Sequence, residues 1–282
     1  MRFVSYEHDG ARRAGALVGQ EIVPIANATE LGTQTPIELL EDPPLQYSLA
    51  VPFAAAKLRP VVPYPGKIIC VGLNYGSHVA ETGRRDSDYP VLFTKFATSL
   101  LGPLDPIVLP AKSEQVDYEA ELAVIIGRAG RRISEGDALN HVAGYAVAND
   151  VTMRDFQYRT HQWLQGKAWD ACTPLGPCLV PPDEIANPAA LTIKLTLNGE
   201  LMQDSDTSRL IFDVPTLIRV CSEFATLEAG DVLLTGTPGG VGFRRDPQVF
   251  LSPGDHVEVD IAGVGHLAND VVTENSEREA NG

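Results

Sequence analysis

One segment, VDYEAELAVIIG at residues 116–127, carries the strongest structural signal in this chain of 282 residues. It is almost continuously apolar from Ala120 to Ile126, a pattern typical of a buried strand. Glu119 and Glu121 stand at the start of that run. Because side chains two positions apart on a strand share a face, we expect the two carboxylates to project side by side.

A third carboxylate, Asp150, ends another apolar run, AGYAVAND at residues 143–150. Two neighbouring buried anions resist ionisation unless they share a cation. Three carboxylates from neighbouring strand ends suit a hard divalent ion such as Mg²⁺, which prefers oxygen ligands and keeps several waters. The alternative is that Glu119 and Glu121 lie on a solvated strand face while Asp150 caps a turn. The spacing alone leaves both interpretations open.

Strands dominate the rest of the chain. The pattern predicts them at residues 67–72, 142–150, 191–198 and 256–261, with a hairpin at 15–25 and helices at 35–40 and from Asp213 onward. Asp213 is a good N-cap, and Pro215 fits the first turn of the helix that follows. Strands outnumber helices and do not alternate with them, so a β-rich α+β fold is predicted rather than a Rossmann or TIM architecture.

The segment RPVVPYPG at residues 59–66 is rich in proline, which restricts the backbone of both itself and its predecessor. We place a boundary there. The prediction is a small N-terminal β-rich domain at residues 1–63 and a catalytic domain at residues 64–272. Residues 273–282, rich in small and charged residues, are predicted to be a disordered tail.

Charge and cysteine content limit the classes of partner. The chain has 22 Lys and Arg against 37 Asp and Glu, a formal net charge of -15, which disfavours nucleic acid and anionic membranes. The 4 cysteines form no C-x-x-C pair, and no secretory signal or membrane-length apolar run is present, so a cytoplasmic location is expected. A small anionic substrate requires a metal or buried cations to reverse the field inside a pocket.

Other candidate functional residues lie outside the acidic segments. His78 and Glu81 are three residues apart on a predicted short helix. In that position the Glu81 carboxylate can orient the His78 imidazole as a general base. The alternative is an ion pair on the surface. Lys95 and Lys167 sit in largely uncharged surroundings, and each can stabilise an oxyanion or neutralise a substrate carboxylate, although a single lysine is more often solvated. In LLTGTPGGVG at residues 233–242, the glycines let backbone N–H groups and the Thr237 hydroxyl approach an anionic ligand.

Read in order, several motifs resemble the fumarylacetoacetate hydrolase family over about residues 64–272. The matching pieces are GLNY at 72–75 with His78 and Glu81, FTKF at 93–96, VDYEAEL at 116–122, NDVTMRD at 149–155, GK at 166–167 and TGTP at 235–238. The resemblance implies a mixed β-roll catalytic domain with a small N-terminal domain, and a homodimer. It also implies Mg²⁺ or Mn²⁺ held by Glu119, Glu121 and Asp150, and action on small anionic 2-oxo acids.

The first functional prediction is metal-dependent hydrolysis of a C–C bond in a 2,4-dioxo acid of the acylpyruvate type. The alternatives on the same scaffold are oxaloacetate decarboxylation and isomerisation of a 2-hydroxymuconate-type diene. An alternative of another class is a non-catalytic binding protein that a metal stabilises. Fold likeness does not choose among them.

The resemblance also suggests roles for individual residues. His78, oriented by Glu81, would deprotonate the attacking water, and Lys167 would hold the resulting oxyanion. Substrate contacts are assigned to Lys95, Arg154, Gln157 and Thr237. Residues 83–90 are predicted to form a lid after the His78 helix.

Overall fold

The computed structural model describes residues 1–33, 35–82 and 88–274. The predicted lid at residues 83–90 falls largely on residues 83–87, and the predicted tail at residues 273–282 falls largely on residues 275–282, which lie outside the described residues. The tail prediction is wrong at its first residue, because Thr273 ends a strand and pairs with Leu109. The division into two domains at residue 63 stays a prediction. Among the described residues, no helix combines the length and the apolar character that crossing a membrane requires.

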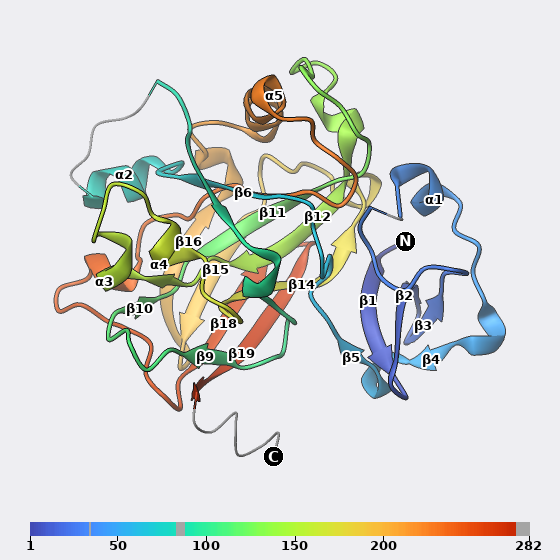
Figure 1. The fold of residues 1–282 in the computed structure, drawn as a ribbon, viewed down its shortest axis with the longest axis horizontal. Coiled ribbons are helices and arrows are strands. Elements are labelled where there is room, and N and C mark those ends of the chain that lie inside the picture. Colours follow the sequence, from blue (N-terminus) through green and yellow to red (C-terminus); the bar gives the residue numbers. More distant parts are fainter. Residues whose placement is uncertain (34, 83–87, 275–282) are drawn as a thin grey trace.

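Twelve strands form one large mixed sheet (Figure 1). They are β1 (Phe3–His8), β2 (Ala11–Val18), β3 (Glu21–Pro24), β4 (Val51–Pro52), β5 (Lys57–Leu58), β6 (Ile68–Gly72), β7 (Val91–Lys95), β8 (Leu100–Leu101), β11 (Ala120–Ile126), β12 (Val142–Asn149), β14 (Thr173–Val180) and β17 (Val232–Leu234). The order is β4-β3-β2-β1-β14-β12-β11-β17-β6-β7, with β5 beside β1 and β8 beside β14. The N-terminal strands therefore continue the large sheet through the β1–β14 pair.

A second sheet of five strands packs against the first. Its strands are β9 (Ile107–Leu109), β15 (Thr192–Leu197), β16 (Glu200–Asp206), β18 (His256–Ile261) and β19 (Gly265–Thr273), in the order β16-β15-β18-β19-β9. A short ladder joins β10 (Val116–Asp117) to β13 (Thr152–Met153). Buried and more exposed side chains alternate along β15 and β18, so one face of this sheet packs in the core and the other faces solvent. The sequence predicts both strands, at residues 191–198 and 256–261.

Helices are short and lie around the sheets. The α-helices are α1 (Ile37–Glu41), α2 (Gly76–Thr82), α3 (Arg154–Gln157), α4 (Leu164–Lys167) and α5 (Val214–Phe224). The 3-10 turns are η1 (Tyr47–Leu49), η2 (Phe53–Ala55), η3 (Ala97–Ser99), η4 (Ala138–His141), η5 (Pro182–Glu184), η6 (Thr207–Arg209) and η7 (Gly242–Arg244). The Asp213 carboxylate accepts a hydrogen bond from the Thr216 N–H at 3.0 Å, which confirms the predicted N-cap of α5. The predicted β-rich α+β fold is confirmed.

Strands β11 and β12 are buried on both faces, which explains their unbroken apolar sequences. One face, with Leu122 and Val124, packs in a core shared with the five-stranded sheet. The opposite face, with Ala123 and Ile125, packs in a second core that includes residues from the N-terminal strands. Counting back by twos from Ala123 places Glu121 and Glu119 on that second face, where its apolar core ends.

Candidate metal and substrate site

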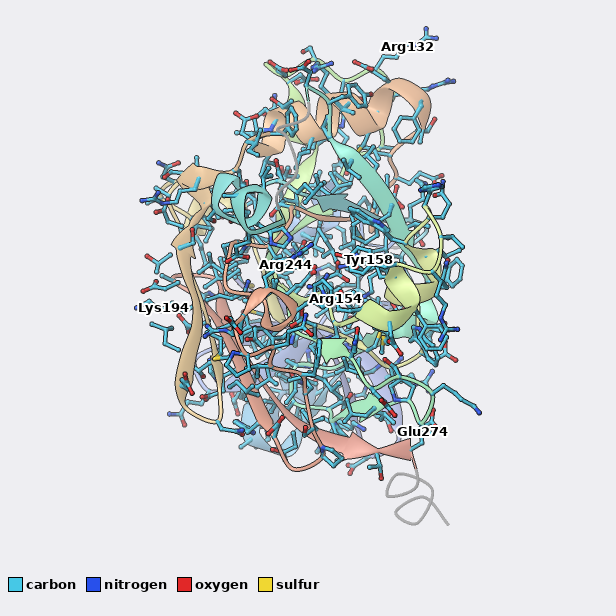
Figure 2. All side chains as sticks on the ribbon, turned by 90° about the vertical axis from the view of Figure 1, so that its left-hand side faces the viewer. Arg132, Arg154, Tyr158, Lys194, Arg244 and Glu274 are labelled. Carbon is cyan, nitrogen blue, oxygen red and sulfur yellow. The ribbon has the colours of Figure 1, made fainter. Side chains whose placement is uncertain are left out.

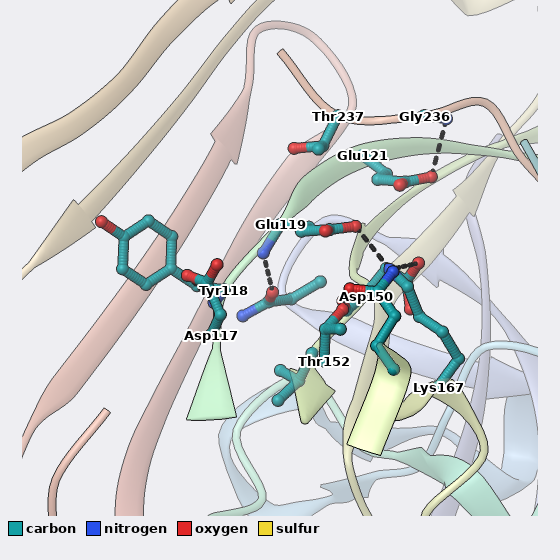
Figure 3. A network of polar contacts seen from close by, with 12 residues as sticks. Asp117, Tyr118, Glu119, Glu121, Asp150, Thr152, Lys167, Gly236 and Thr237 are labelled. Atoms are coloured by element: carbon teal, nitrogen blue, oxygen red, sulfur yellow. Dashed lines mark hydrogen bonds and ion pairs between the residues drawn. The ribbon is translucent and has the colours of Figure 1, made fainter. Parts of the chain in front are cut away.

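Three carboxylates meet at one end of the β11–β12 pair. The antiparallel register places Ala120 opposite Asn149. Glu119, just before β11, and Glu121, its second residue, therefore lie beside Asp150, which directly follows β12. Ligand oxygens of these three residues, the acidic triad, all lie within 4.8 Å of one another. The Asp150 N–H donates to the Glu119 carbonyl at 2.9 Å and fixes the two strand ends together. Figure 3 shows the three carboxylates converging.

The triad is buried, so the alternative of a solvated strand face is wrong. Exposed fractions are 4% for Glu119, 1% for Glu121 and 0% for Asp150. Burying several carboxylates together is costly unless cations compensate them. A set of carboxylate oxygens in this arrangement fits a hard divalent ion such as Mg²⁺ or Mn²⁺, and the triad would hold it.

Two lysines compensate part of the triad's charge. The Lys167 ammonium donates to Glu119 Oε2 and Asp150 Oδ2, both at 2.7 Å. The Lys95 ammonium donates to Asp150 Oδ1 at 2.6 Å and to the Val151 carbonyl at 3.1 Å. Burial opposes the charge on both ammonium groups, but the neighbouring carboxylates raise the pKa of each, so both stay protonated.

The two glutamates differ in their surroundings. Burial favours the neutral form of Glu119, but Lys167 and Arg154 outweigh it and lower the pKa of Glu119 to about 2. Burial raises the pKa of Glu121 well above its usual range, and the charges of Asp150 and Glu119 raise it further. Of the three carboxylates, Glu121 is therefore the one that most lacks a positive partner.

A glycine loop donates a backbone hydrogen bond to Glu121. The Gly236 N–H donates to Glu121 Oε2 at 2.8 Å (Figure 3). Gly236 has φ +100, and a Cβ there would lie 2.9 Å from the Asn74 Cβ. Asn74 in turn donates to the carbonyls of Thr235 at 2.8 Å and Phe212 at 3.0 Å, and so holds this loop in place.

Arg154 connects the triad to a buried aspartate. Its guanidinium contacts Asp117 Oδ2 at 2.7 and 2.8 Å and Glu119 Oε1 at 2.6 Å. Asp117 also accepts hydrogen bonds from the N–H groups of Gly242 at 2.8 Å and Phe243 at 3.0 Å. Figure 2 shows Arg154 inside the molecule, whereas Lys194 on β15 lies at its edge. The predicted substrate residue Arg154 therefore has two carboxylate partners of its own.

His78 and Glu81 meet on α2 as predicted. His78 Nδ1 lies 3.5 Å from Glu81 Oε2, and Glu81 Oε1 accepts a hydrogen bond from the Gly240 N–H at 2.6 Å. His78 is 8% exposed, so the pair is not a freely solvated surface pair. Glu81 therefore contacts both the imidazole and the glycine loop.

A pocket opens beside the triad. Its polar lining combines most of the predicted residues: His78, Glu119, Glu121, Arg154, Gln157, Lys167 and Thr237. Its apolar lining includes Phe93 and Trp163, and the Trp163 ring packs where a Cβ on Gly72 would stand, at 2.4 Å. Gly166 allows α4 to approach α3, because a Cβ there would lie 2.5 Å from Gln157.

Lys95 differs from the prediction of a substrate contact. It is fully buried behind Asp150 and does not line the pocket. Its ammonium is the partner of Asp150 on the side away from Lys167, which makes it a support for the triad.

Sequence reasoning missed three buried polar residues, Asn74, Asp117 and Gln203. Asn74 and Asp117 lie inside motifs that the sequence had already marked, and both are 0% exposed. Gln203 lies on β16 between the buried Met202 and the exposed Asp204, and nothing in that local sequence indicates that its amide is buried.

Comparisons with known proteins agree on one family. The model for the fumarylacetoacetate hydrolase C-terminal domain matches residues 67–272. The mitochondrial oxaloacetate tautomerase Fahd2a of Rattus norvegicus is 48% identical over 209 residues, covering 74% of this chain and about two thirds, 67%, of that protein.

Two solved structures share the fold. A 5-carboxymethyl-2-hydroxymuconate delta-isomerase from Mycobacterium smegmatis matches with a TM-score of 0.83 and 32% identity, covering 97% of this chain and 100% of that chain. A maleylpyruvate hydrolase from Sphingobium sp. SYK-6, in complex with manganese (II) ion and pyruvate, matches with a TM-score of 0.77 and 32% identity, covering 97% and 99%.

Glu121→Gln tests the triad as a metal site. The change keeps the shape and the bond from Gly236 but removes a ligand charge, so we expect the Mn²⁺ dissociation constant to rise at least tenfold by calorimetry. The free energy of unfolding without metal should not fall, because one of several repelling carboxylates is removed. Glu223→Gln on α5 is the control. Mn²⁺ affinity equal to that of the unchanged protein would remove Glu121 from the ligand set.

Gly236→Ala tests the loop that holds Glu121. We expect the free energy of unfolding to fall by about 1–3 kcal/mol, because the change combines a left-handed backbone with a close contact. Gly19→Ala is matched: Gly19 has φ +62 with no heavy atom within 4 Å of the added Cβ. Urea denaturation of both variants should show the larger loss at Gly236, and equal losses would contradict a role for the Asn74 contact.

Proposed function

Since this chain belongs to the fumarylacetoacetate hydrolase family, we propose that it is a divalent-metal-dependent enzyme that interconverts the keto and enol forms of oxaloacetate or a similar 2-oxo dicarboxylic acid. The resemblance found in the motifs of residues 64–272 is confirmed. The observation that carries the proposal is the convergence of the buried triad, within 4.8 Å, beside a pocket that also holds His78 and Lys167.

The relatives bear on which reaction this site performs. The sequence predicts hydrolysis of an acylpyruvate first, with oxaloacetate decarboxylation and hydroxymuconate isomerisation as alternatives. Relatives named as oxaloacetate tautomerases and a neighbour named as a hydroxymuconate isomerase support the alternatives better. All of these reactions pass through an enol or enolate of a 2-oxo acid, so one site chemistry serves them.

A bound Mg²⁺ or Mn²⁺ would act as a Lewis acid toward the oxygens of a 2-oxo acid. Lys167 contributes a hydrogen-bond donor at the same place. Its ammonium has three N–H groups, of which two bind Glu119 and Asp150, so the third is available to a substrate oxygen in the pocket. That donor would hold the 2-oxo oxygen as it gains negative charge and receives a proton.

His78 supplies the base in this proposal. Its Nδ1 faces Glu81, which leaves Nε2 for the pocket. Nε2 would take a proton from C3, the carbon next to the keto group, while the C2–C3 bond becomes double. The imidazolium would then deliver that proton, directly or through water, to the 2-oxo oxygen, so one C–H bond is exchanged for one O–H bond and His78 returns to its neutral form. Glu81 would stabilise the intermediate imidazolium.

Hydrolysis remains the second candidate, because the maleylpyruvate hydrolase structure carries manganese and pyruvate on the same fold. In a hydrolysis by this protein, the His78 imidazole would take a proton from the attacking water instead of from C3. The alternative of a non-catalytic binding protein is less well supported. The pocket holds His78 next to the triad, together with Lys167, which has a third N–H group available to a ligand.

The purified protein with Mg²⁺ should speed the interconversion of enol and keto oxaloacetate, followed by the ultraviolet absorbance of the enol. Chelation of the metal should abolish this rate, and added Mg²⁺ or Mn²⁺ should restore it. Pyruvate release from oxaloacetate and from an acylpyruvate, measured with lactate dehydrogenase, separates decarboxylation and hydrolysis from tautomerisation. No change in any of the three rates would refute an enzymatic function.

His78→Ala should lower the tautomerisation rate by about 10²-fold or more, the usual contribution of a general base. Mn²⁺ affinity should stay unchanged, because His78 is not part of the triad. His256→Ala is the control, since His256 pairs with Asp270 on the exposed face of β18. A full rate in His78→Ala would assign the proton transfer to another group.

A further inference from the structure

We propose that Gln203 is a positioning residue that holds the Thr237 hydroxyl as a hydrogen-bond donor to the substrate carboxylate. The inference rests on the proposed function, because it takes the ligand to be a 2-oxo acid. Gln203 lies on β16 in the second sheet and is 1% exposed. It does not line the pocket, so it acts through Thr237, which does.

Two backbone groups fix the orientation of the Gln203 amide. Its Oε1 accepts a hydrogen bond from the Ala120 N–H at 2.9 Å, and its Nε2 donates to the Pro238 carbonyl at 2.9 Å. Exchanging the oxygen and nitrogen would set donor against donor and acceptor against acceptor. The positions of the amide oxygen and nitrogen are therefore fixed, because the Ala120 N–H can only donate and the Pro238 carbonyl can only accept.

The same nitrogen determines how the Thr237 hydroxyl is used. Gln203 Nε2 lies 2.9 Å from Thr237 Oγ1. Because an amide NH₂ group can only donate, the hydroxyl oxygen accepts this bond. The hydroxyl proton must then be offered to a different group.

Nothing in the described part of the protein, residues 1–33, 35–82 and 88–274, accepts that proton in a hydrogen bond. Thr237 lines the pocket together with Glu119, Glu121 and Lys167. Figure 3 shows Thr237 next to Gly236 on the loop that passes over Glu121. The hydroxyl thus offers a donor to an oxygen of a ligand in the pocket, and it selects an acceptor such as a carboxylate over an N–H group.

Gln203 also couples this donor to the triad. Ala120, whose N–H it accepts, lies between Glu119 and Glu121 on the strand. The loop of Thr237 is packed directly on β16, because a Cβ on Gly240 would lie 2.2 Å from the Met202 carbonyl oxygen. One side chain therefore sets the spacing between the metal-binding carboxylates and the proposed substrate donor.

A double-mutant cycle tests the proposal, with oxalate as an unreactive probe for the 2-oxo acid. Calorimetry first measures Mn²⁺ binding to each variant and then oxalate binding to the Mn²⁺-saturated protein. Thr237→Val and Gln203→Met should each raise the oxalate dissociation constant about tenfold, the loss of one hydrogen bond to a charged group. Thr237→Ser, which keeps the hydroxyl, should bind oxalate as the unchanged protein does.

The coupling is the decisive readout. The double variant should bind oxalate no more weakly than Thr237→Val alone, because Gln203 acts through the hydroxyl. Mn²⁺ affinity should stay within about twofold in all variants. Gln203→Glu keeps an acceptor for the Ala120 N–H and draws the hydroxyl proton toward itself, so it should also weaken oxalate binding. Gln248→Met, a surface change of the same type, should have no effect.

Additive losses in the double variant would overturn the proposal, as would full oxalate affinity in Thr237→Val or Gln203→Glu. A loss of Mn²⁺ affinity in Gln203→Met equal to its loss of oxalate affinity would overturn it too, because Gln203 would then act through the triad strand. Failure of oxalate to bind the unchanged protein would have the same consequence. Coupled oxalate binding without turnover of oxaloacetate would refute the proposed function and leave this inference intact.

Discussion

Four carboxylates cannot share one buried region without positive charge beside them, and the chemistry of this protein follows from that constraint. Asp117 and the acidic triad are all buried, and the described cations next to them are Lys95, Arg154 and Lys167. The protein's own charges therefore leave one carboxylate in excess. A divalent ion held by the triad would turn that excess into a net positive charge, which would suit an anionic substrate even though the chain as a whole carries a net charge of -15.

The distribution of that charge over the three carboxylates is uneven. Asp150 is contacted by both lysines, and Glu119 by Lys167 and Arg154. Among the residues that the structure describes, Glu121 has no cationic partner and accepts a hydrogen bond from a backbone N–H. The triad therefore combines two carboxylates that are held ionised with one whose ionised form needs a further cation. The same three carboxylates would therefore determine both how tightly a metal ion binds and how much positive charge the site offers to a substrate.

Neutral side chains set the geometry around the cluster. Asn74 holds the loop that presents Gly236 to Glu121, and Gln203 connects Ala120 to Thr237 in the same loop. Each satisfies backbone groups that would otherwise be buried without partners, so each is required both by the fold and by the site. The pocket is thus built on strands and on loops that side-chain amides hold in place.

The sequence by itself determined the strands, the β-rich class and the acidic residues, because apolar runs and the period of two along a strand are local properties. The meeting of Glu119, Glu121 and Asp150 was also predictable, since the first pair share a face and Asp150 ends a neighbouring run. Only the tertiary structure decided that Lys95 contacts Asp150 and does not line the pocket. It also decided that Asp117 pairs with Arg154 and that Gln203 contacts Thr237. These contacts join residues between 34 and 83 positions apart, and no local pattern encodes which distant partner a buried polar group will find.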